Sequence, residues 1–241
     1  NKNIYLKKFI LKKFAEKFYA SYFVKNLNKI PFVDAKLAVS KDYFTINKQD
    51  KYITNIKSRT LGNFLRSKDD CLLTTSKTIN ADDPLLDCRV EGLEKKTPNV
   101  IILDRFMKIK KNSKVFKQNK RKIFIVTNVK NFSKEVFLKS KGVKIIKLIK
   151  QTDESLNLKN MLMAIKGIGF NRILVESGNT FLNQLLKSNL IRNFYLFKSS
   201  KNIHSKGQNN SSILHIKKIK IFRKSRIKTN LKGDSLFKIN L

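Results

Sequence analysis

One short segment combines the residue types that α/β proteins use to hold ligands. Ile173–Glu176 is an apolar strand pattern ending in a carboxylate, and Ser177–Asn179 turns the chain into a helix expected from about Thr180. A helix start exposes unpaired N–H groups and the positive end of the helix dipole, so this turn can hold a phosphate or pyrophosphate. Glu176 stands at the carboxyl end of its strand, where ligands of such sheets bind. An ordinary strand-to-helix turn has the same pattern, so both interpretations stay open for this segment alone.

A second polar segment, Thr74–Arg89, follows another apolar run. It offers hydroxyl groups, then the turn-forming Asp82-Asp83-Pro84, then an arginine. Hydroxyls and a carboxylate suit ribose and amide groups, and Arg89 suits a phosphate. Taken by itself, a loop of turn-forming residues explains this segment equally well.

The elements that must position these segments alternate between short apolar runs and helical patterns. Strands are expected at 32–39, 71–74, 100–103, 122–127, 143–148, 172–176 and 194–197. Helices are expected after the capping residue Asn55 and at 132–139, 156–165 and 180–190. This order predicts an α/β fold, a mostly parallel central sheet with helices on both faces. After a polar loop at 199–212, Lys217–Phe222 and Ser235–Leu241 are predicted to add an antiparallel strand pair.

Residues 1–30 form a separate unit, a helical connector that precedes one α/β domain at 31–241. Apolar residues recur there at three- and four-residue steps between lysines, the stripe of an amphipathic helix: Leu6, Phe9, Ile10, Phe14, Phe18, Tyr22 and Phe23. Such a stripe packs on a neighbouring domain or subunit, or lies on an anionic membrane surface. No run of about 18 uncharged apolar residues occurs, so a membrane span is not expected.

The charge balance is strongly basic, with 53 Lys and Arg against 17 Asp and Glu, a formal charge of +36. Only nine of the basic residues are arginines, the side chain that reads phosphates and base edges, and the lysines are spread along the whole chain. We interpret this as residue-usage bias and expect no specific nucleic-acid partner, although 108–122 and 217–228 would bind nucleic acid weakly at low salt.

Cysteine and histidine are too few for a disulfide framework or a zinc site. Cys71 and Cys88 stand 17 residues apart, and His204 and His215 are the only histidines. A reducing, cytoplasmic setting and no metal are therefore expected.

Four segments carry a resemblance to a known family when they are read together and in order. They are Pro31-Phe32-Val33 through Lys36-Leu37-Ala38-Val39-Ser40-Lys41-Asp42, Tyr52-Ile53-Thr54 with Leu65-Arg66 beyond it, Thr78 through Arg89, and Val175 through Leu182. In these the chain resembles the reductase domain of the bifunctional riboflavin-biosynthesis deaminase/reductase, which has a dihydrofolate-reductase-like fold.

The resemblance implies an activity and a set of site residues. The activity is the NADPH-dependent reduction of 5-amino-6-(5-phosphoribosylamino)uracil to its ribitylamino counterpart. Cofactor-contacting positions fall on Ala38, Tyr52, Thr78, Asp82, Arg105, Gly178, Asn179, Thr180, Phe181 and Leu182. Substrate-contacting positions fall on Asp50, Arg66, Leu86, Arg89 and Glu176, and Lys36 stands near the reacting carbon.

The chemistry of that reaction needs an acid, because an imine accepts hydride at C1′ of the opened ribose far more readily when it is protonated. Lys36 and Glu176, on strands expected to be neighbours, are the candidates to supply and orient the proton. Arg66 and Arg89 come from different segments and are expected to converge on the 5′-phosphate.

The chain departs from the family pattern at several of these positions. Lys41 replaces Leu, Tyr43 replaces Gly, Tyr52 replaces Trp, Asp50 replaces Ser, and Ser177 replaces the first Gly of the turn. Ser177 is compatible only with a backbone that has no positive φ there.

Three other functions are consistent with parts of this pattern. A pteridine-reducing relative of the same fold would keep the cofactor turn without needing two phosphate-binding arginines. A catalytically idle relative would keep only the fold, and a basic nucleic-acid-binding protein would not depend on Glu176. The resemblance further implies a homodimer and a zinc deaminase as fused or companion domain, although the chain has no His-x-Glu or Pro-Cys-x-x-Cys signature.

Overall fold

The structure is a computed structural model that describes residues 7, 10–20, 22, 29–117, 121–149, 151–209 and 213–241. Leu6, Phe9 and Phe23 of the expected amphipathic stripe, and residues 210–212 of the expected loop, lie outside the described residues.

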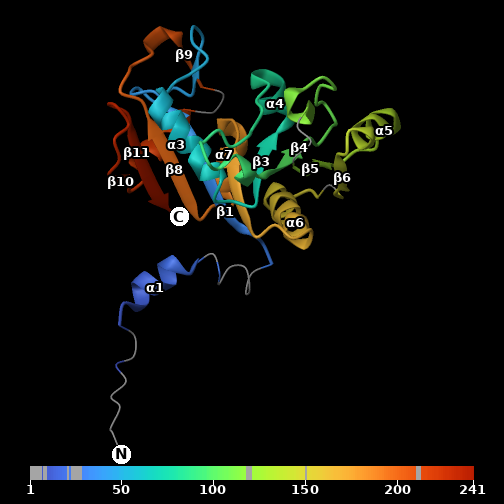
Figure 1. The fold of residues 1–241 in the computed structure, drawn as a ribbon, viewed down its shortest axis with the longest axis horizontal. Helices are drawn as coiled ribbons and strands as arrows, with labels where there is room; N and C mark the ends of the chain where they lie inside the picture. Colours follow the sequence, from blue (N-terminus) through green and yellow to red (C-terminus); the bar gives the residue numbers. More distant parts are fainter. Residues whose placement is uncertain are drawn as a thin grey trace, which may run out of the picture.

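A nine-stranded sheet forms the centre of the molecule (Figure 1). Its strands, in spatial order, are β10 (Ser225–Ile227), β11 (Ser235–Asn240), β8 (Asn193–Lys198), β1 (Phe32–Val39), β7 (Arg172–Glu176), β3 (Cys71–Thr75), β4 (Asn99–Leu103), β5 (Ile123–Thr127) and β6 (Lys144–Lys147). The strands from β8 to β6 run parallel, while β11 is antiparallel to β8, and β10 to β11. The predicted mostly parallel sheet with an antiparallel C-terminal edge is confirmed.

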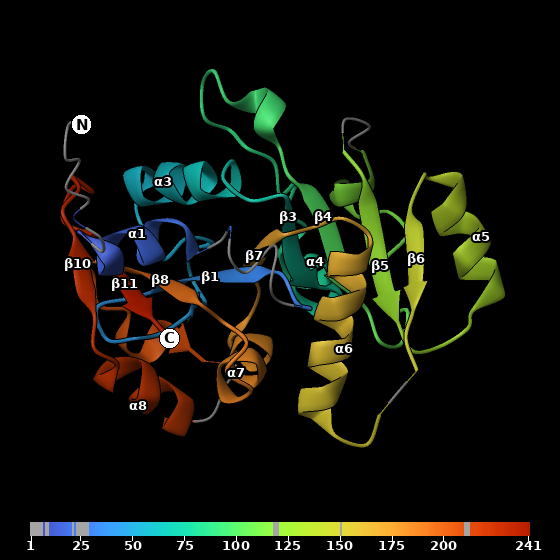
Figure 2. The ribbon, with the colours of Figure 1, turned by 90° about the horizontal axis from the view of Figure 1, so that it is seen from below.

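Helices cover both faces of the sheet (Figure 2). One face carries α3 (Ile56–Arg66), α4 (Ser76–Asp82) and α5 (Phe132–Ser140), which bury Leu65, Ile79 and Leu138 in one apolar cluster. The other carries α6 (Glu154–Gly167), α7 (Asn179–Lys187) and α8 (Ile213–Ile221), which contribute to a second cluster. Because successive side chains of a strand point to opposite faces, each central strand supplies both clusters.

The alternation along β1 decides which face holds the candidate site. Val33, Ala35, Leu37 and Val39 lie in the cluster under α6, α7 and α8, whereas Ala38 packs against the cluster on the α3 side. Lys36 stands two residues before Ala38 and therefore faces α3.

Side-chain caps fix where several helices begin. Asn55 accepts a hydrogen bond from the backbone N–H of Ser58 at 3.1 Å, as predicted, and Thr75 accepts one from Thr78 at 3.2 Å. The N-cap of α7 is Gly178, which provides no side-chain acceptor. The first N–H groups of α7 are thus left to other partners.

One local prediction near the C-terminus was wrong. Lys217–Phe222 was predicted as a strand, but most of this region belongs to α8, and β10 takes its place beside β11. Ile216 and Ile219 are 8% and 0% exposed and three residues apart, so the buried face has helical spacing. The polar segment after β3, for which no helix was predicted, begins with α4.

The segment at 199–209, predicted as an irregular loop, is held by pairing. Its β9 (Gly207–Gln208) forms a two-stranded antiparallel sheet with β2 (Ile46–Asn47). A Cβ at Gly207 would lie 2.2 Å from the ring of Phe44, so only glycine allows this close approach. Asp42 also accepts the N–H groups of Ile203 and His204, at 3.1 and 2.8 Å. Short 3-10 helices lie at Glu94–Lys96, Lys114–Lys117 and His204–Lys206.

The segment predicted as an N-terminal connector includes α1 (Lys12–Phe18), which is shorter than the predicted helix and stands apart from the sheet in Figure 1. Ile10, Phe14 and Phe18 of its stripe are 61%, 66% and 70% exposed, so they do not pack on the α/β domain. None of the helices in the described part of the chain has the length and apolar character needed to cross a membrane.

Candidate active site on the α3 face of the sheet

Lys36 and Glu176 stand side by side in the middle of the sheet. They are register partners on the parallel strands β1 and β7, as the sequence predicted from the neighbouring strands. Arg66, at the end of α3, binds Glu176 with two hydrogen bonds, from Nε to Oε1 at 2.7 Å and from Nη2 to Oε2 at 2.9 Å. The Arg66 and Glu176 side chains are only 13% and 12% exposed. Such a two-bond pair fixes the carboxylate plane as well as its charge.

The charges of this group determine which residue can give up a proton. Burial acts to raise the pKa of Glu176, but Arg66, with Lys36 beside it, outweighs burial and brings that pKa to about 2. Burial lowers the pKa of Lys36, as does Arg66, while Glu176 opposes the change. Glu176 is therefore a permanent carboxylate near neutral pH, and Lys36 is the group of the pair that carries a transferable proton.

Besides Glu176 and Arg66, an aromatic ring and a glycine lie close to the Lys36 ammonium. The Phe197 ring centre lies 5.7 Å from Nζ. Gly62 lies on the other side in the middle of α3, where an added Cβ would be 3.6 Å from Cε and 3.8 Å from Nζ of Lys36. A glycine at this place leaves room beside the ammonium that any other residue would occupy.

Arg66 and Arg89 meet at Asp87. Arg66 Nη1 donates to the backbone carbonyl of Asp87 at 2.8 Å, and Arg89 Nε donates to the Asp87 carboxylate at 2.8 Å. The side chain of Arg89 is 58% exposed. Both arginines thus contact Asp87, a residue the sequence did not single out, while their expected convergence on a phosphate stays a prediction. Leu86 lies next to them, but its residue exposure is 3% and its side chain packs in the core.

The predicted cofactor turn lies beside the end of β3. The Gly178 N–H donates to Thr78 Oγ1 at 3.4 Å, and Thr78 Oγ1 is 3.0 Å from Thr75 Oγ1. Asn179 is 1% exposed and donates to Thr45 Oγ1 at 3.1 Å, while its buried Oδ1 has no hydrogen-bond partner within the described structure.

The remaining residues of α7 that were predicted to contact the cofactor divide into two kinds. Phe181 and Leu182 are 5% and 1% exposed and belong to the core under the sheet, so their side chains anchor α7. Thr180 is exposed on the first turn of that helix.

The residues predicted on the loops around the sheet are more scattered. Tyr52 is 47% exposed, and the Arg59 guanidinium lies 4.0 Å from its ring centre. Asp50 is exposed and accepts the N–H of Tyr52 at 3.0 Å. Asp82 ends α4, and burial raises its pKa while Lys51, of the same loop as Asp50 and Tyr52, lowers it. This interaction brings the loop and α4 together; the structure shows no contact of Asp50 with Lys36 or Glu176.

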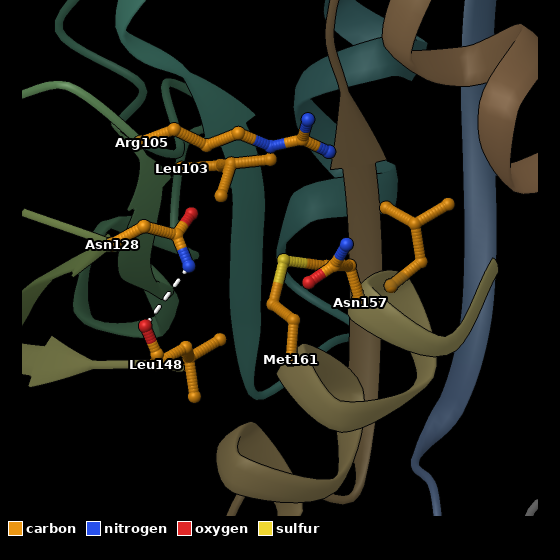
Figure 3. Close-up of a pocket in the computed structure, with 7 residues that line it drawn as sticks. Leu103, Arg105, Asn128, Leu148, Asn157 and Met161 are labelled. Carbon is orange, nitrogen blue, oxygen red and sulfur yellow. Dashed lines mark hydrogen bonds between the residues drawn. The ribbon is translucent and has the colours of Figure 1, made fainter. Parts of the chain in front are cut away.

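Arg105 lies at a small pocket beyond the ends of β4, β5 and β6 (Figure 3). The pocket is lined by Leu103, Arg105, Asn128, Leu148, Asn157, Leu158 and Met161. Glu154 of α6 accepts from Arg105 at 3.5 Å and from Gln184 of α7 at 2.6 Å, which ties the pocket's edge to the helix after Gly178. Its walls are apolar apart from Arg105 and the amide side chains of Asn128 and Asn157. This pocket is lined by α6 residues, whereas Lys36 faces α3, so it is separate from the Lys36–Glu176 pair.

Two departures from the family pattern can be read from the backbone. Tyr43, which replaces a glycine, has φ 70°, so a bulky residue here adopts the left-handed conformation that glycine adopts without strain. Ser177 is not among the described residues with positive φ, and its replacement of glycine is therefore tolerated.

The donor set fits a bound dinucleotide. An added Cβ at Gly178 would meet nothing within 4 Å, so the helix start is open to a ligand. Asn179 Oδ1 is a buried acceptor that has no donor within the described structure. The hydroxyl of Thr74, near the end of β3, is also buried without a hydrogen-bond partner there. Within the described residues, no three His, Cys, Asp or Glu side chains are grouped as a metal site.

Sequence reasoning missed Asp87, Gly62 and Arg121. Arg121 lies at the start of β5 and donates to the carbonyls of Leu85 and Leu86. The sequence signal that could have identified Arg121 is the rarity of arginine, because only nine of the 53 basic residues in this chain are arginines.

The sheet order and the two helical layers define a dihydrofolate-reductase-like α/β fold, which solved structures share. Riboflavin-biosynthesis protein RibD of Acinetobacter baumannii superposes with a TM-score of 0.76 at 19% identity, covering 96% of this chain and 64% of that one. The Saccharomyces cerevisiae riboflavin biosynthesis reductase Rib7 does so with a TM-score of 0.69 at 20% identity, covering 94% and 98%.

The chain belongs to the RibD C-terminal domain family, whose model matches residues 31–203. Among curated proteins it is similar to the 2,5-diamino-6-ribosylamino-4(3H)-pyrimidinone 5′-phosphate reductase of Debaryomyces hansenii, 28% identical over 183 residues that cover 70% of this chain and 74% of that protein. It is also similar to RibD of Buchnera aphidicola subsp. Baizongia pistaciae, 24% identical over 198 residues. That match covers 75% of this chain and 51% of the relative, so the chain spans about half the length of that protein.

Proposed function

We propose that the protein catalyses the NADPH-dependent reduction of 5-amino-6-(5-phosphoribosylamino)uracil to 5-amino-6-(5-phosphoribitylamino)uracil. The observation that carries the proposal is the buried Lys36–Glu176 pair with Arg66 clamped onto the carboxylate. Family membership and the names of the relatives support the choice of a phosphorylated ribosylamino-pyrimidine.

In the proposed reaction the bound nicotinamide supplies a hydride to C1′ of the ring-opened imine. The Lys36 ammonium donates a proton to the imine nitrogen, so that carbon and nitrogen together gain the two hydrogens of the amine. Glu176 cannot be the donor, because Arg66 keeps its pKa near 2. Its negative charge instead stabilises and orients the Lys36 ammonium. General acid catalysis of this kind contributes about 10²–10⁴-fold to a rate.

Binding of the two ligands is divided between the elements already described. Gly178, Asn179 and Thr78 would hold the pyrophosphate and nicotinamide side of the dinucleotide, and the pocket beside Arg105 its adenine side. Arg89, exposed beside Arg66, would receive the 5′-phosphate of the substrate.

The pyrimidine ring of the substrate is the point on which the relatives differ. The D. hansenii protein is named for a diaminopyrimidinone, and a Buchnera aphidicola subsp. Acyrthosiphon pisum relative, 28% identical over 166 residues, for the phosphoribosylamino-uracil. The two rings undergo the same reduction at C1′, so the diaminopyrimidinone phosphate is the second candidate substrate.

The proposal extends to partners. A Thermotoga maritima structure with a TM-score of 0.72 is named as both a deaminase and a reductase, which supports a zinc deaminase as fused or companion domain for this chain. We further propose that the reductase acts as a homodimer, which size-exclusion chromatography with light scattering tests.

The proposed activity is tested by following NADPH oxidation with each of the two pyrimidines, followed by mass spectrometry of the product. We expect a ribityl product two mass units above the substrate with the uracil compound, and loss of most turnover in Glu176→Gln. Turnover of the diaminopyrimidinone alone would assign the second substrate. Reduction of a pteridine in its place, or no turnover by folded protein, would refute the proposal, and salt-sensitive nucleic-acid binding independent of Glu176 would favour a different function.

A further inference from the structure

The Arg121 guanidinium makes specific hydrogen bonds with the backbone of another segment. Its Nη1 donates to the carbonyl of Leu86 at 2.6 Å, and its Nη2 donates to the carbonyl of Leu85. Arg121 lies two residues before β5, and its guanidinium bridges two consecutive peptide carbonyls of another segment. A planar fork can make both bonds at once, whereas a lysine has a single nitrogen.

The segment that Arg121 holds has an unfavourable backbone. Leu86 has φ 56° and Asp83 has φ 42°, and left-handed conformations of such residues cost on the order of 1 kcal/mol or more each. They persist only where neighbouring contacts impose them. Asp83 is held by the N–H of Lys114 at 2.8 Å, and Leu86 by Arg121.

The next residue along this segment is the meeting point of the two site arginines. The Asp87 carbonyl accepts from Arg66, and the Asp87 carboxylate accepts from Arg89, both at 2.8 Å. The direction in which this peptide presents its carbonyl is set by the two preceding peptides, whose carbonyls Arg121 binds. A rotation of the Leu86 backbone would move the Asp87 carbonyl away from Arg66.

Electrostatics agrees with this proximity. Burial lowers the pKa of Arg121 to about 10, Asp87 acts to raise it, and Arg66 to lower it. The buried Nε of Arg121 has no hydrogen-bond partner within the described structure. Burying this donor unpaired has a cost in free energy, which the two hydrogen bonds to the carbonyls must offset.

We infer that Arg121 is a positioning residue, which fixes the Leu85–Asp87 backbone and thereby holds the Asp87 carbonyl against Arg66 and the Asp87 carboxylate against Arg89, so that the exposed Arg89 guanidinium is placed to bind a phosphate group. Arg121 itself does not touch the substrate. The consequence for catalysis rests on the proposed function, whereas the placement of the two arginines is a property of the ligand-free protein.

The first test therefore needs no turnover. The chain has nine arginines, few enough for their Nε–H signals to be resolved in a spectrum of protein labelled with ¹⁵N-arginine. In Arg121→Lys we expect the Arg66 and Arg89 signals to move, and the response of Arg89 to added D-ribose 5-phosphate to weaken about tenfold. Arg192→Lys is the matched control, since Arg192 is exposed and its backbone atoms make hydrogen bonds with Val33 and Leu241.

If Arg121→Lys does not fold, Arg121→Gln gives the same reading, because its amide reaches at most one of the two carbonyls. Unchanged Arg66 and Arg89 signals in a folded variant would overturn the inference, whatever the activity of the wild type. A wild-type Arg89 signal that does not respond to ribose 5-phosphate would overturn phosphate binding by Arg89 as well.

The second test separates positioning from a general loss of structure. In Arg121→Lys, KM for the phosphorylated substrate should rise about tenfold, equivalent to about 1.4 kcal/mol, while kcat stays within about threefold. With the dephosphorylated substrate the same variant should match the wild type. Equal losses with both substrates would show a purely structural role and overturn the inference. No turnover by the wild type would refute the proposed function, leaving the arginine signals to decide the role of Arg121.

Discussion

Two buried groups of acidic and basic side chains lie on the same face of β1 and β7 and carry protons differently. The carboxyl-end group is Lys36, Arg66 and Glu176, and the amino-end group is Asp34, Asp69 and Arg172. In the first, Glu176 has two cations beside it, and its pKa is about 2. In the second, Arg172 is shared between Asp34 at 3.3 Å and Asp69 at 3.5 Å, and burial with the nearby Asp34 raises the pKa of Asp69 to about 7.

This difference shows that the ratio of cations to carboxylates, rather than burial alone, sets the protonation of these groups. The carboxylates of both groups are largely removed from solvent, yet Glu176 keeps a permanent negative charge beside an ammonium, whereas Asp69 titrates near neutral pH. The carboxyl-end group adjoins the open helix start at Gly178 and can act on a ligand. The amino-end group lies at the opposite ends of the strands and ties them together.

The largest expected effect separates the two groups by function. Replacing the proposed acid in Lys36→Met removes the proton donor, so kcat should fall by about 10²–10⁴-fold. Asp34→Asn, on the same strand and face, should leave kcat within a few-fold, because its amide can still pair with Asn193. Steady-state NADPH oxidation measures both. Comparable losses in the two variants would remove the functional distinction.

Breaking the arginine contact of each group should have unequal costs in stability. Arg66→Met leaves Glu176 buried without its main partner, which costs about 3–5 kcal/mol of unfolding free energy, and Glu176→Gln in the same chain should restore part of it. Arg172→Met should cost less, because Asp69 takes up a proton when its cation is lost. Urea unfolding at pH 7 gives the unfolding free energies of the wild type, the two single arginine variants and the double variant. Equal losses in Arg66→Met and Arg172→Met would contradict the account.

The pH dependence of stability should have opposite signs in the two groups. The folded-state pKa of Asp69 is raised from 3.8 to about 7, so its contribution is complete below about pH 4 and is lost as pH rises through 7. Asp69→Asn should therefore match the wild type near pH 4 and exceed it near pH 8, by at most about 4 kcal/mol. The pKa of Glu176 is lowered to about 2, so its contribution is present above about pH 4.5 and is lost as pH falls. Parallel pH curves for the wild type and Asp69→Asn would refute the first assignment.

The smallest effect is expected at the glycine beside Lys36. Gly62→Ala places a methyl group in ordinary contact with Cε and Nζ, at 3.6 and 3.8 Å, and favours the helix by somewhat under 1 kcal/mol. We expect a slightly more stable protein whose kcat/KM falls a few-fold, because the methyl occupies space next to the ammonium. Gly167→Ala, at the end of α6 where an added Cβ meets nothing within 4 Å, is the control that should not change activity.

The central sheet and the Lys36–Glu176 pair could be predicted because local signals and global structure agree there. Runs such as Val100–Leu103 and Ile173–Val175 are apolar on both faces, the pattern of a parallel strand covered by helices. Parallel order then places residues at similar distances along neighbouring strands side by side.

Other features could not be predicted because no local pattern encodes them. Isoleucine and lysine in the region of α8 fit both a strand and a helix, and only the burial of Ile216 and Ile219 on one face decides. The two-residue strands β2 and β9 are too short to show alternation. Asp87 and Arg121 act through main-chain contacts between segments 21 and about 35 residues apart, which a sequence does not display.

The most direct test of the central claim, that Lys36 donates the proton and Glu176 holds it in place, is the alkaline limb of the kcat profile against pH. Activity should fall as Lys36 loses its proton, below the ordinary lysine pKa of 10.5, because burial lowers that pKa. Since Glu176 opposes this lowering, the limb should move to lower pH in Glu176→Gln and stay in place in Asp34→Asn. An alkaline limb at the same pH in the wild type and Glu176→Gln would contradict the account.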